Sequence, residues 1–278
     1  MQILINDPGD ARIAEYRNLR RDDFKAFDRT TFVAEGRKVV RRLCESGLVV
    51  RSMLVQSQMA TEAARWVHDD VPVYTASKEQ LANITGFDFH RGFLAIGERP
   101  PMQPSETLVQ HLRRPPVTGV APVVIAPVGV QDRENFGSIL RSATAFGIRD
   151  CLLSRWSADP FARRVVRTSM GTVFRQTMFF AEDLDTQLPL WTAQGIRVIA
   201  TTPTDALPMQ NMVFDNRPIV LMIGHEGDGL HRPWIEAASD RVCIPIANDT
   251  DSLNASVAAA ILMHHFTVAR IARPLTDT

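Results

Sequence analysis

The sequence predicts an α/β protein whose larger domain, residues 119–278, holds a parallel sheet covered by helices on both faces. Two observations predict this class. The first is a series of strand-length runs that are apolar almost throughout, as buried parallel strands are: "PVVIAPV", "DCLLS", "IRVIATT", "PIVLMIG" and "RVCIPI". The second is the helical periodicity of the segments between these runs. Helices are expected near residues 136–146, 160–168, 184–194, 232–238 and 254–271.

A smaller α/β domain is expected over residues 1–100. The stretch "TFVAEGRKVVRRLCESGL" has the pattern of a helix that buries Val40, Leu43 and Cys44, and "VRSMLVQS" and "VPVYTAS" have the pattern of strands. Two more helices are expected, one over residues 59–67 and one after Ser77.

A proline-rich stretch, "GERPPMQPSETLVQHLRRPPVTG", separates the two domains. Proline fixes φ and removes a backbone donor, so a cluster of prolines interrupts regular structure. We therefore expect residues 101–118 to be a linker with a short helix inside it.

The composition is that of a globular protein with a packed core, because 45% of the residues are hydrophobic and 22% are charged. No apolar run reaches the roughly 18 residues that a membrane helix needs. The first residues, "MQILINDPGD", lack the basic flank and apolar stretch of a signal peptide. The expected location is therefore the cytoplasm, without a membrane partner.

The three cysteines, Cys44, Cys151 and Cys243, lie far apart in apolar surroundings, and no CxxC pair is present. This pattern favours buried free thiols over a disulfide framework or a zinc site. No other spacing typical of metal ligands occurs, so no metal is expected.

The formal net charge is +0, which does not by itself indicate a nucleic-acid-binding protein. Basic residues nevertheless cluster in the first domain, at "RNLRR" and at "GRKVVRR". The second cluster consists of Arg37, Lys38, Arg41 and Arg42. Charge alone leaves open whether this cluster is a solvated helix face or a surface that binds RNA.

The chemistry is expected after the strands, because open parallel sheets bind ligands at the carboxyl ends of their strands. "GHEGDGL", starting at Gly224, follows one strand, and its glycines permit a tight turn and close approach of a ligand. "ANDTDSLNASVAAAIL" follows another and has more polar residues than helix capping requires. "QDRENFGSILRSATAFGI" follows a third, with Asn135 as the expected N-cap and Arg141 as one cation among small residues.

Three stretches in this order resemble the signature of the SpoU/TrmH family of RNA ribose 2′-O-methyltransferases, in the SPOUT class. They are "NFGSILRSATAFG", "LMIGHEGDGL" and "IPIANDTDSLNASVAAAI", and "CLLSRWSADPFARRVVRTSMGTVFR" is also similar to the family. The resemblance covers residues 117–272. In the first domain, "FVAEGRKVVRRL" and "ITGFDFHRGFLAIGE" resemble the L30e/L7Ae-like RNA substrate-binding domain that many members carry.

The resemblance implies S-adenosylmethionine as the methyl donor and a ribose 2′-hydroxyl of structured RNA as the acceptor. It also implies a trefoil knot at the C-terminus, an exception to the usual unknotted topology, and a homodimer. The extra N-terminal domain favours ribosomal over transfer RNA as the substrate.

The resemblance also assigns site residues. The implied cofactor-binding residues are Thr201, Gly224, Ile244, Ile246, Ser252, Leu253 and Asn254. The implied catalytic residues are Arg141, Asn135, Glu226, Ser252 and Asn254. Two features depart from the family pattern: Asn248 stands where a glycine is usual, and His264 and His265 stand near a usual Tyr-Glu pair.

The family assigns the arginine a catalytic role, in some members as a general base. Guanidinium stays protonated in proteins, so Arg141 is better suited to stabilise the developing alkoxide or to hold a phosphate. Two other functions remain open. A SPOUT enzyme that methylates bases would share the cofactor site but not usually the "NxGxxxR" stretch, and a noncatalytic RNA-binding protein would not need the intact polar residues.

Overall fold

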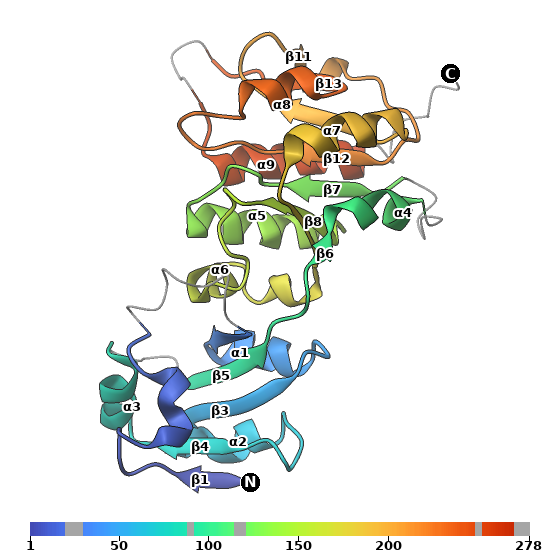
Figure 1. The fold of residues 1–278 in the computed structure, drawn as a ribbon. Helices are drawn as coiled ribbons and strands as arrows, with labels where there is room; N and C mark the ends of the chain where they lie inside the picture. The colour runs from blue at the N-terminus through green and yellow to red at the C-terminus, as the bar shows by residue number, and fades with distance from the viewer. Residues whose placement is uncertain (20–29, 88–91, 114–120, 248–251, 270–278) are drawn as a thin grey trace. The chain divides into compact units, whose positions relative to one another are not determined.

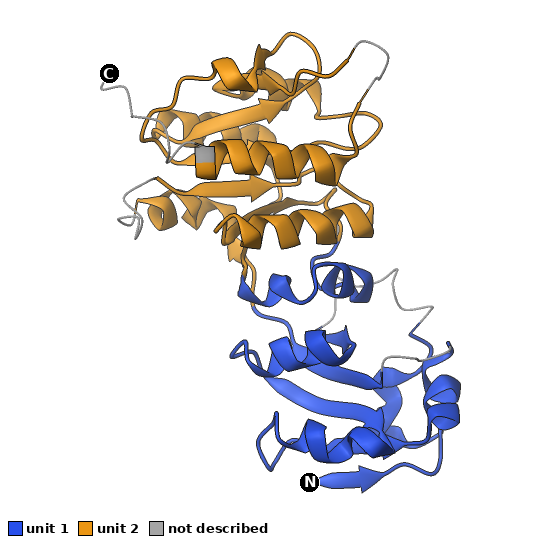
Figure 2. Cartoon of the chain, turned by 180° about the vertical axis from the view of Figure 1, so that it is seen from behind, with its two compact units in different colours: residues 1–100, 159–175 blue, residues 101–158, 176–278 orange. Residues whose placement is uncertain are grey.

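The computed structural model describes residues 1–19, 30–87, 92–113, 121–247 and 252–269. The chain forms two compact units (Figure 2). Unit 1 consists of Met1–Pro100 and Asp159–Arg175, and unit 2 consists of Pro101–Ala158 and Gln176–Thr278. Residues 119–278 therefore do not all belong to one unit, because the chain leaves unit 2 after Ala158 and returns to it at Gln176.

Unit 1 contains a five-stranded sheet in the order β1-β4-β3-β5-β2. Its strands are β1 (Gln2–Leu4), β2 (Thr31–Glu35), β3 (Val50–Gln56), β4 (Val73–Ala76) and β5 (Phe93–Glu98). β1, β4 and β3 are parallel, and β5 runs antiparallel to both β3 and β2. The expected helix over the whole of "TFVAEGRKVVRRLCESGL" is wrong at its start. Residues Thr31–Glu35 pair with β5, and Gly36, at φ 96°, redirects the chain before the helix begins.

The helices of unit 1 are short. They are η1 (Ala11–Tyr16), α1 (Arg37–Cys44), η3 (Ser57–Met59), α2 (Ala60–Ala64), α3 (Lys78–Thr85), α6 (Arg163–Thr168) and η5 (Thr172–Arg175). α1 buries Val40 and Leu43, as its pattern predicts, but Cys44 at its last position is only half-buried. α3 begins at a capping box in which Ser77 and Gln80 exchange side-chain and backbone hydrogen bonds.

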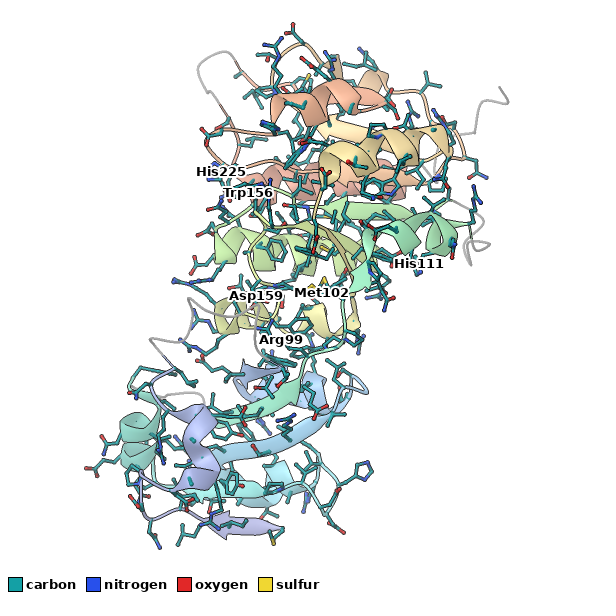
Figure 3. The ribbon with its side chains drawn as sticks, viewed as in Figure 1. Arg99, Met102, His111, Trp156, Asp159 and His225 are labelled. Carbon is teal, nitrogen blue, oxygen red and sulfur yellow. The ribbon has the colours of Figure 1, made fainter. Side chains whose placement is uncertain are left out.

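Residues 159–175 belong to unit 1 because polar and aromatic contacts hold them there. The guanidinium of Arg99 donates to both carboxylate oxygens of Asp159, at 3.0 and 2.7 Å, and both side chains are buried (Figure 3). Arg163 pairs with Glu35 at the end of β2. The ring of Phe32 packs on those of Phe161 and Phe174, with centroids 5.0 and 5.4 Å away. Buried, bidentate pairs of this kind fix geometry strongly.

Unit 2 is built on an eight-stranded sheet in the order β11-β13-β10-β12-β7-β8-β9-β6, and its paired strands are parallel (Figure 1). The strands are β6 (Gln103–Pro104), β7 (Val123–Ala126), β8 (Asp150–Ser154), β9 (Thr177–Ala181), β10 (Arg197–Thr201), β11 (Leu207–Pro208), β12 (Ile219–Met222) and β13 (Asp240–Cys243). The predicted α/β class with a parallel sheet is confirmed, and the five apolar runs are β7, β8, β10, β12 and β13.

Helices cover both faces of this sheet. They are η4 (Ser105–Thr107), α4 (Leu108–Leu112), α5 (Arg133–Ala145), α7 (Leu184–Ala193), η6 (Met209–Asn211), α8 (Arg232–Ala237), α9 (Ala255–His264) and the π-helical turn η7 (His265–Ala269). α4, α7 and α8 share one hydrophobic core with the strands, in which Leu188, Trp191 and Trp234 are buried. α5 and α9 pack against each other (Figure 1).

The stretch expected as a linker differs from that expectation over residues 101–113. It adds β6 to the edge of the sheet, and α4 buries Leu108 and Leu112 in the core of unit 2. His111 also contacts Asp150, with Nε2 and Oδ1 3.0 Å apart (Figure 3). The expected short helix is present, but its apolar side makes it part of unit 2. Residues 114–118 lie outside the described part of the chain.

The described residues include no helix that is long and apolar enough to cross a membrane, and no group of three or more side chains that could hold a metal. The three cysteines are free, as expected, but only Cys151 is buried, whereas Cys44 and Cys243 are half-buried. Burial raises the pKa of the Cys44 thiol to about 11 and that of the Cys151 thiol further still, so both remain protonated near neutral pH.

Candidate functional site

A pocket of about 490 Å³ lies at the carboxyl ends of β10, β12 and β13. This volume is in the range of small-molecule sites, and the carboxyl edge is where open parallel sheets hold ligands. Most of the cofactor-binding residues implied by the sequence line it: Thr201, Gly224, Ile244, Ile246, Ser252 and Leu253. Asn254, the remaining one, does not line it but begins α9 directly beside Leu253.

The pocket combines apolar walls with backbone and hydroxyl groups. Ile223, Ile244 and Leu253 contribute apolar surface, and Leu262 of α9 lies behind them. The hydroxyl of Thr201 donates to the carbonyl of Met222 at 2.8 Å, which ties the end of β10 to the end of β12. Its oxygen can still accept a hydrogen bond from a ligand.

The loop after β12 forms a closed turn that shapes one side of the pocket. His225 and Gly229 exchange backbone hydrogen bonds at 2.9 and 3.0 Å, and Gly229 has a φ of 68°. The ring nitrogen Nδ1 of His225 accepts from the backbone N–H groups of Gly227 and Asp228, at 3.0 and 3.2 Å. A glycine is required at Gly224, since a Cβ there would lie 2.5 Å from the backbone nitrogen of Leu230.

We expect Gly224→Ala to close this side of the pocket. The added methyl group meets backbone, which cannot move aside as a side chain can, so the variant should lose about 1–3 kcal/mol of stability and bind cofactor at least about tenfold more weakly. Thermal unfolding and calorimetric titration measure both effects. Gly227→Ala is the matched control, since its Cβ would lie 3.5 Å from the His225 ring. Equal cofactor affinities for the two variants would contradict the assignment of this turn to the site.

Three polar side chains from distant parts of the sequence meet beside the pocket. Asn135 of α5 donates from Nδ2 to Oε1 of Glu226 at 2.9 Å. Its Oδ1 accepts from Nδ2 of Asn254, also at 2.9 Å. We call Asn135, Glu226 and Asn254 the polar trio. Glu226 lines the pocket, so the trio connects the pocket to the first turn of α5 and the first turn of α9.

Capping explains how two members of the trio are oriented. Asn254 caps α9, since its Oδ1 accepts from the backbone of Ser256 and Val257 at 2.9 and 3.3 Å. The prediction that Asn135 caps α5 is wrong. α5 begins at Arg133, three residues before the expected start at Phe136, and Asp132 is the cap, because its carboxylate accepts from the backbone N–H of Asn135 at 2.8 Å. The side chain of Asn135 is therefore available for Glu226 and Asn254.

Arg141 lies elsewhere on α5. It follows Asn135 by six residues, which places it about 9 Å further along the helix axis and on another face. It is exposed, and it does not line the pocket. Of the implied catalytic residues, the structure thus brings together Asn135, Glu226 and Asn254 and places Ser252 at the pocket, but leaves Arg141 apart.

Several pocket residues were not among the implied site residues. Thr202 and Thr204 follow β10, and Cys243 ends β13. The position of Thr202 and Thr204 at the end of an apolar run is the signal that could have identified these two residues. The two histidines that depart from the family pattern pack against aromatic rings. His264 contacts Phe146 edge-on, and His265 packs on Phe214 and Phe266. Asn248 and its polar neighbours lie outside the described residues.

The four basic residues implied in RNA binding lie on α1 of unit 1 and are exposed. Arg37 pairs with Glu62, Arg41 pairs with Glu45, and Arg42 donates to the carbonyl of Met170 at 2.6 Å. Exposed ion pairs of this kind contribute little to stability, so these cations can exchange their partners for phosphates at small cost.

The fold and the pocket define an α/β protein that binds a small molecule at the carboxyl edge of a parallel sheet. The model of the SpoU rRNA Methylase family matches residues 122–264, which include the pocket and the polar trio. The chain belongs to the SpoU methylase family of RNA methyltransferases.

Individual relatives agree with this assignment. An uncharacterized tRNA/rRNA methyltransferase of Mycobacterium tuberculosis is 33% identical over 94% of this chain and 90% of its own length. The 23S rRNA (guanosine(2553)-2′-O)-methyltransferase RlmP of Bacillus subtilis is 25% identical over 84% of this chain and 88% of its own. Among solved structures, an AdoMet-bound rRNA methyltransferase from Sinorhizobium meliloti has the same fold, with a TM-score of 0.78, 22% identity, and coverage of 95% of this chain and 97% of that one.

Proposed function

We propose that this protein transfers the methyl group of S-adenosylmethionine to a ribose 2′-hydroxyl of structured RNA, with ribosomal RNA favoured over transfer RNA. The observation that carries the proposal is the polar trio, which joins a residue of the pocket to the starts of two helices. The relative RlmP, a 23S rRNA 2′-O-methyltransferase, supports both the acceptor group and the kind of RNA.

The pocket residues fit S-adenosylmethionine. Ile223, Ile244 and Ile246 suit the flat adenine ring and the apolar thioether chain, while backbone groups near Gly224 suit the polar edges of the nucleoside. Ser252 and Leu253 would lie towards the methionine part. When bound, the cofactor supplies an electrophilic methyl group on a sulfonium. The solved relative from Sinorhizobium meliloti, which binds AdoMet, supports this assignment.

The residues of the chain orient the acceptor. We infer that Glu226 and Asn254 hold the ribose hydroxyls and that Asn135 fixes both of these side chains through its amide. Arg141, exposed on α5, would bind the phosphate beside the acceptor nucleotide and stabilise negative charge on the 2′-oxygen as it attacks. The hydroxyl proton would pass to water or to a substrate phosphate, because a guanidinium cannot accept it.

We also propose that two copies associate through α9 and that the C-terminal segment forms the trefoil knot of the family. Val257 of α9 and Val268 of η7 are large apolar side chains with exposed fractions of 48% and 46%. A second copy covering them would remove this surface from water. Light scattering tests the dimer. The wild type is expected to be a dimer and Val257→Glu a monomer, and a monomeric wild type would contradict the proposal.

We propose the cytoplasm as the location of the protein.

Methyl transfer to RNA from a strain that lacks the gene tests the function. Purified protein and labelled S-adenosylmethionine are expected to label ribosomal RNA, and digestion should release a 2′-O-methylnucleoside. A labelled base would favour a SPOUT base methyltransferase. Cofactor and RNA binding without any transfer would favour a noncatalytic RNA-binding protein.

Unit 1 is proposed to recognise the RNA, with Arg37, Lys38, Arg41 and Arg42 of α1 on its phosphates. Two exposed arginines of residues 159–175, Arg164 and Arg175, add charge to the same unit. Deleting the first 116 residues would not test this role cleanly, because it would remove α4 from unit 2 and the partners of Asp159 and Arg163 from unit 1.

Surface variants in the full chain are the better experiment. Lys38→Ala combined with Arg41→Ala is expected to weaken RNA binding and to lower the slope of log K against log salt by about 1.4–1.8, because two phosphate contacts are lost. The affinity for cofactor and the rate at saturating RNA should not change. Arg232→Ala on α8, also an exposed cation, is the control. An unchanged slope would show that α1 does not contact RNA phosphates.

A further inference from the structure

A large aromatic side chain is exposed beside the site. Trp156, in the turn after β8, has an exposed fraction of 51%, whereas Trp191 and Trp234 are buried at 1% and 9%. The remaining tryptophan, Trp66, stacks on Phe93 with ring centroids 5.0 Å apart. Tryptophan combines a large apolar ring with a polar N–H and is enriched at interfaces, so this exposed ring is a candidate contact for a partner.

The turn that carries Trp156 is held firmly. The backbone N–H of Trp156 donates to Oγ of Ser154 at 3.1 Å, and the buried Ser154 hydroxyl itself donates to the carbonyl of Val128. Ser157 donates to the carbonyl of Pro127 at 3.0 Å, and it too is buried. These bonds hold the turn against Pro127 and Val128, which lie in the loop between β7 and α5. The exposed ring therefore stands on a rigid base and loses little entropy on binding.

The order of the strands shows where this turn lies relative to the pocket and the polar trio. Along the sheet the order is β10-β12-β7-β8. The pocket lies at β10 and β12, Asn135 follows β7, and Trp156 follows β8, so Trp156 lies on the side of the polar trio away from the cofactor pocket. The loop between β7 and α5 touches the pocket turn, since a Cβ on Gly129 would lie 2.8 Å from the backbone nitrogen of His225. Trp156 and His225 appear at the same end of unit 2 in Figure 3.

A cation accompanies the ring. The guanidinium carbon of Arg155 lies 5.1 Å from the centre of the Trp156 ring, within cation–π distance. An aromatic platform with an adjacent arginine is the combination by which proteins hold unpaired nucleotides, with a base stacked on the ring and a phosphate beside the cation. A stacked guanidinium also leaves the opposite face of the ring for a base.

We propose that Trp156 is a stacking platform for an unpaired base of the substrate RNA next to the methylated nucleotide, and that Arg155 binds a phosphate beside it. The proposal rests on the RNA methyltransferase assignment and does not depend on which atom of the nucleotide receives the methyl group. Trp156 is a positioning residue in this account, because it holds the neighbouring nucleotide while the polar trio holds the acceptor.

Trp156→Ala tests the platform in the full-length protein. Loss of one stacked base should weaken binding to ribosomal RNA from a strain that lacks the gene by about 5- to 150-fold. The affinity for S-adenosylmethionine should remain as in the wild type, because Trp156 does not line the cofactor pocket. Trp156→Phe keeps a flat ring and should retain most of the affinity, and Trp66→Phe is the control in unit 1.

Fluorescence separates stacking from a structural role. A short oligoribonucleotide should quench tryptophan emission in the wild type, whereas an abasic oligomer with the same number of phosphates should not. The quenching should disappear in Trp156→Phe. Wild-type RNA affinity in Trp156→Ala, or equal quenching by the abasic oligomer, would overturn the proposal. So would dissociation of a dimer in Trp156→Ala, since the ring would then be an interface residue. Methylation of a base in place of a ribose would overturn only the proposed function.

Discussion

Replacement of Arg141 by alanine is expected to slow methyl transfer by about 10²–10³-fold, the usual effect of losing one group that stabilises charge in a transition state. Arg141 is exposed on α5 and does not line the pocket, so its removal should leave the fold and the cofactor dissociation constant unchanged. Single-turnover methylation at saturating RNA measures the first effect, and calorimetric titration measures the second.

Two further variants sharpen this prediction. Arg141→Lys should restore part of the rate, because a point charge replaces the charge of the planar guanidinium but not its fork of donors. Arg149→Ala removes an exposed arginine just before β8, at the amino ends of the strands, whereas the pocket lies at their carboxyl ends. This variant should not change the rate of methyl transfer. Full activity of Arg141→Ala would exclude a catalytic role. Lost cofactor binding would move Arg141 to the donor site.

Asn135→Ala is expected to slow methyl transfer by about 10²-fold, because it removes the amide that fixes both Glu226 and Asn254. Asn254 should still cap α9 through its backbone contacts, so stability should change little. The decrease should appear in the single-turnover rate, with the cofactor dissociation constant changed only slightly.

The pH dependence of the Asn135→Asp variant distinguishes a role of Asn135 in methyl transfer from a merely structural role. The carboxylate keeps an acceptor for Asn254 but places a second negative charge against Glu226. Two carboxylates in contact share a proton more readily as the pH falls, and the shared proton restores a hydrogen bond between them. The activity of this variant relative to the wild type should therefore rise as the pH is lowered. A constant ratio across pH would contradict the role assigned to the trio.

The sequence was sufficient for the parts of the fold that depend on local pattern. The strands β7, β8, β10 and β12 are mostly apolar because both of their faces are buried, and this pattern needs no knowledge of their partners. Thr31–Glu35 was expected to be helical because its apolar residues run directly into those of α1. The break between them depends on the backbone of Gly36 alone.

The division into units could not be predicted in the same way. Residues 159–175 follow β8 of unit 2 without a change in composition, and they join unit 1 through Arg99–Asp159, Arg163–Glu35 and contacts to Phe32. Arg99 and Asp159 are 60 positions apart, so no local pattern relates them. The linker expectation failed for a related reason, since α4 has an apolar side whose partners all lie later in the chain.

In the candidate site, too, some residues could be predicted from the sequence, whereas contacts between distant residues could not. Placement after a strand was enough to indicate Gly224, because the carboxyl ends of parallel strands meet at one edge, while Thr201 and Ile244 came from the resemblance to the SpoU family. The contacts of Asn135 span 91 positions to Glu226 and 119 to Asn254, so only the folded chain reveals them. Asn135 was expected to be a cap because Asp132 and Asn135 are both suitable for that position.

Nucleoside mass spectrometry can show whether the protein methylates a ribose 2′-hydroxyl in ribosomal RNA in the cell. Ribosomal and transfer RNA are isolated from wild type, from a strain that lacks the gene, and from that strain complemented with wild type or with Arg141→Ala. We predict that one 2′-O-methylnucleoside is lost from ribosomal RNA without the gene, returns with the wild-type gene, and does not return with the variant. Loss of a base-methylated nucleoside, or an unchanged set of ribose methylations in both RNAs, would contradict the account.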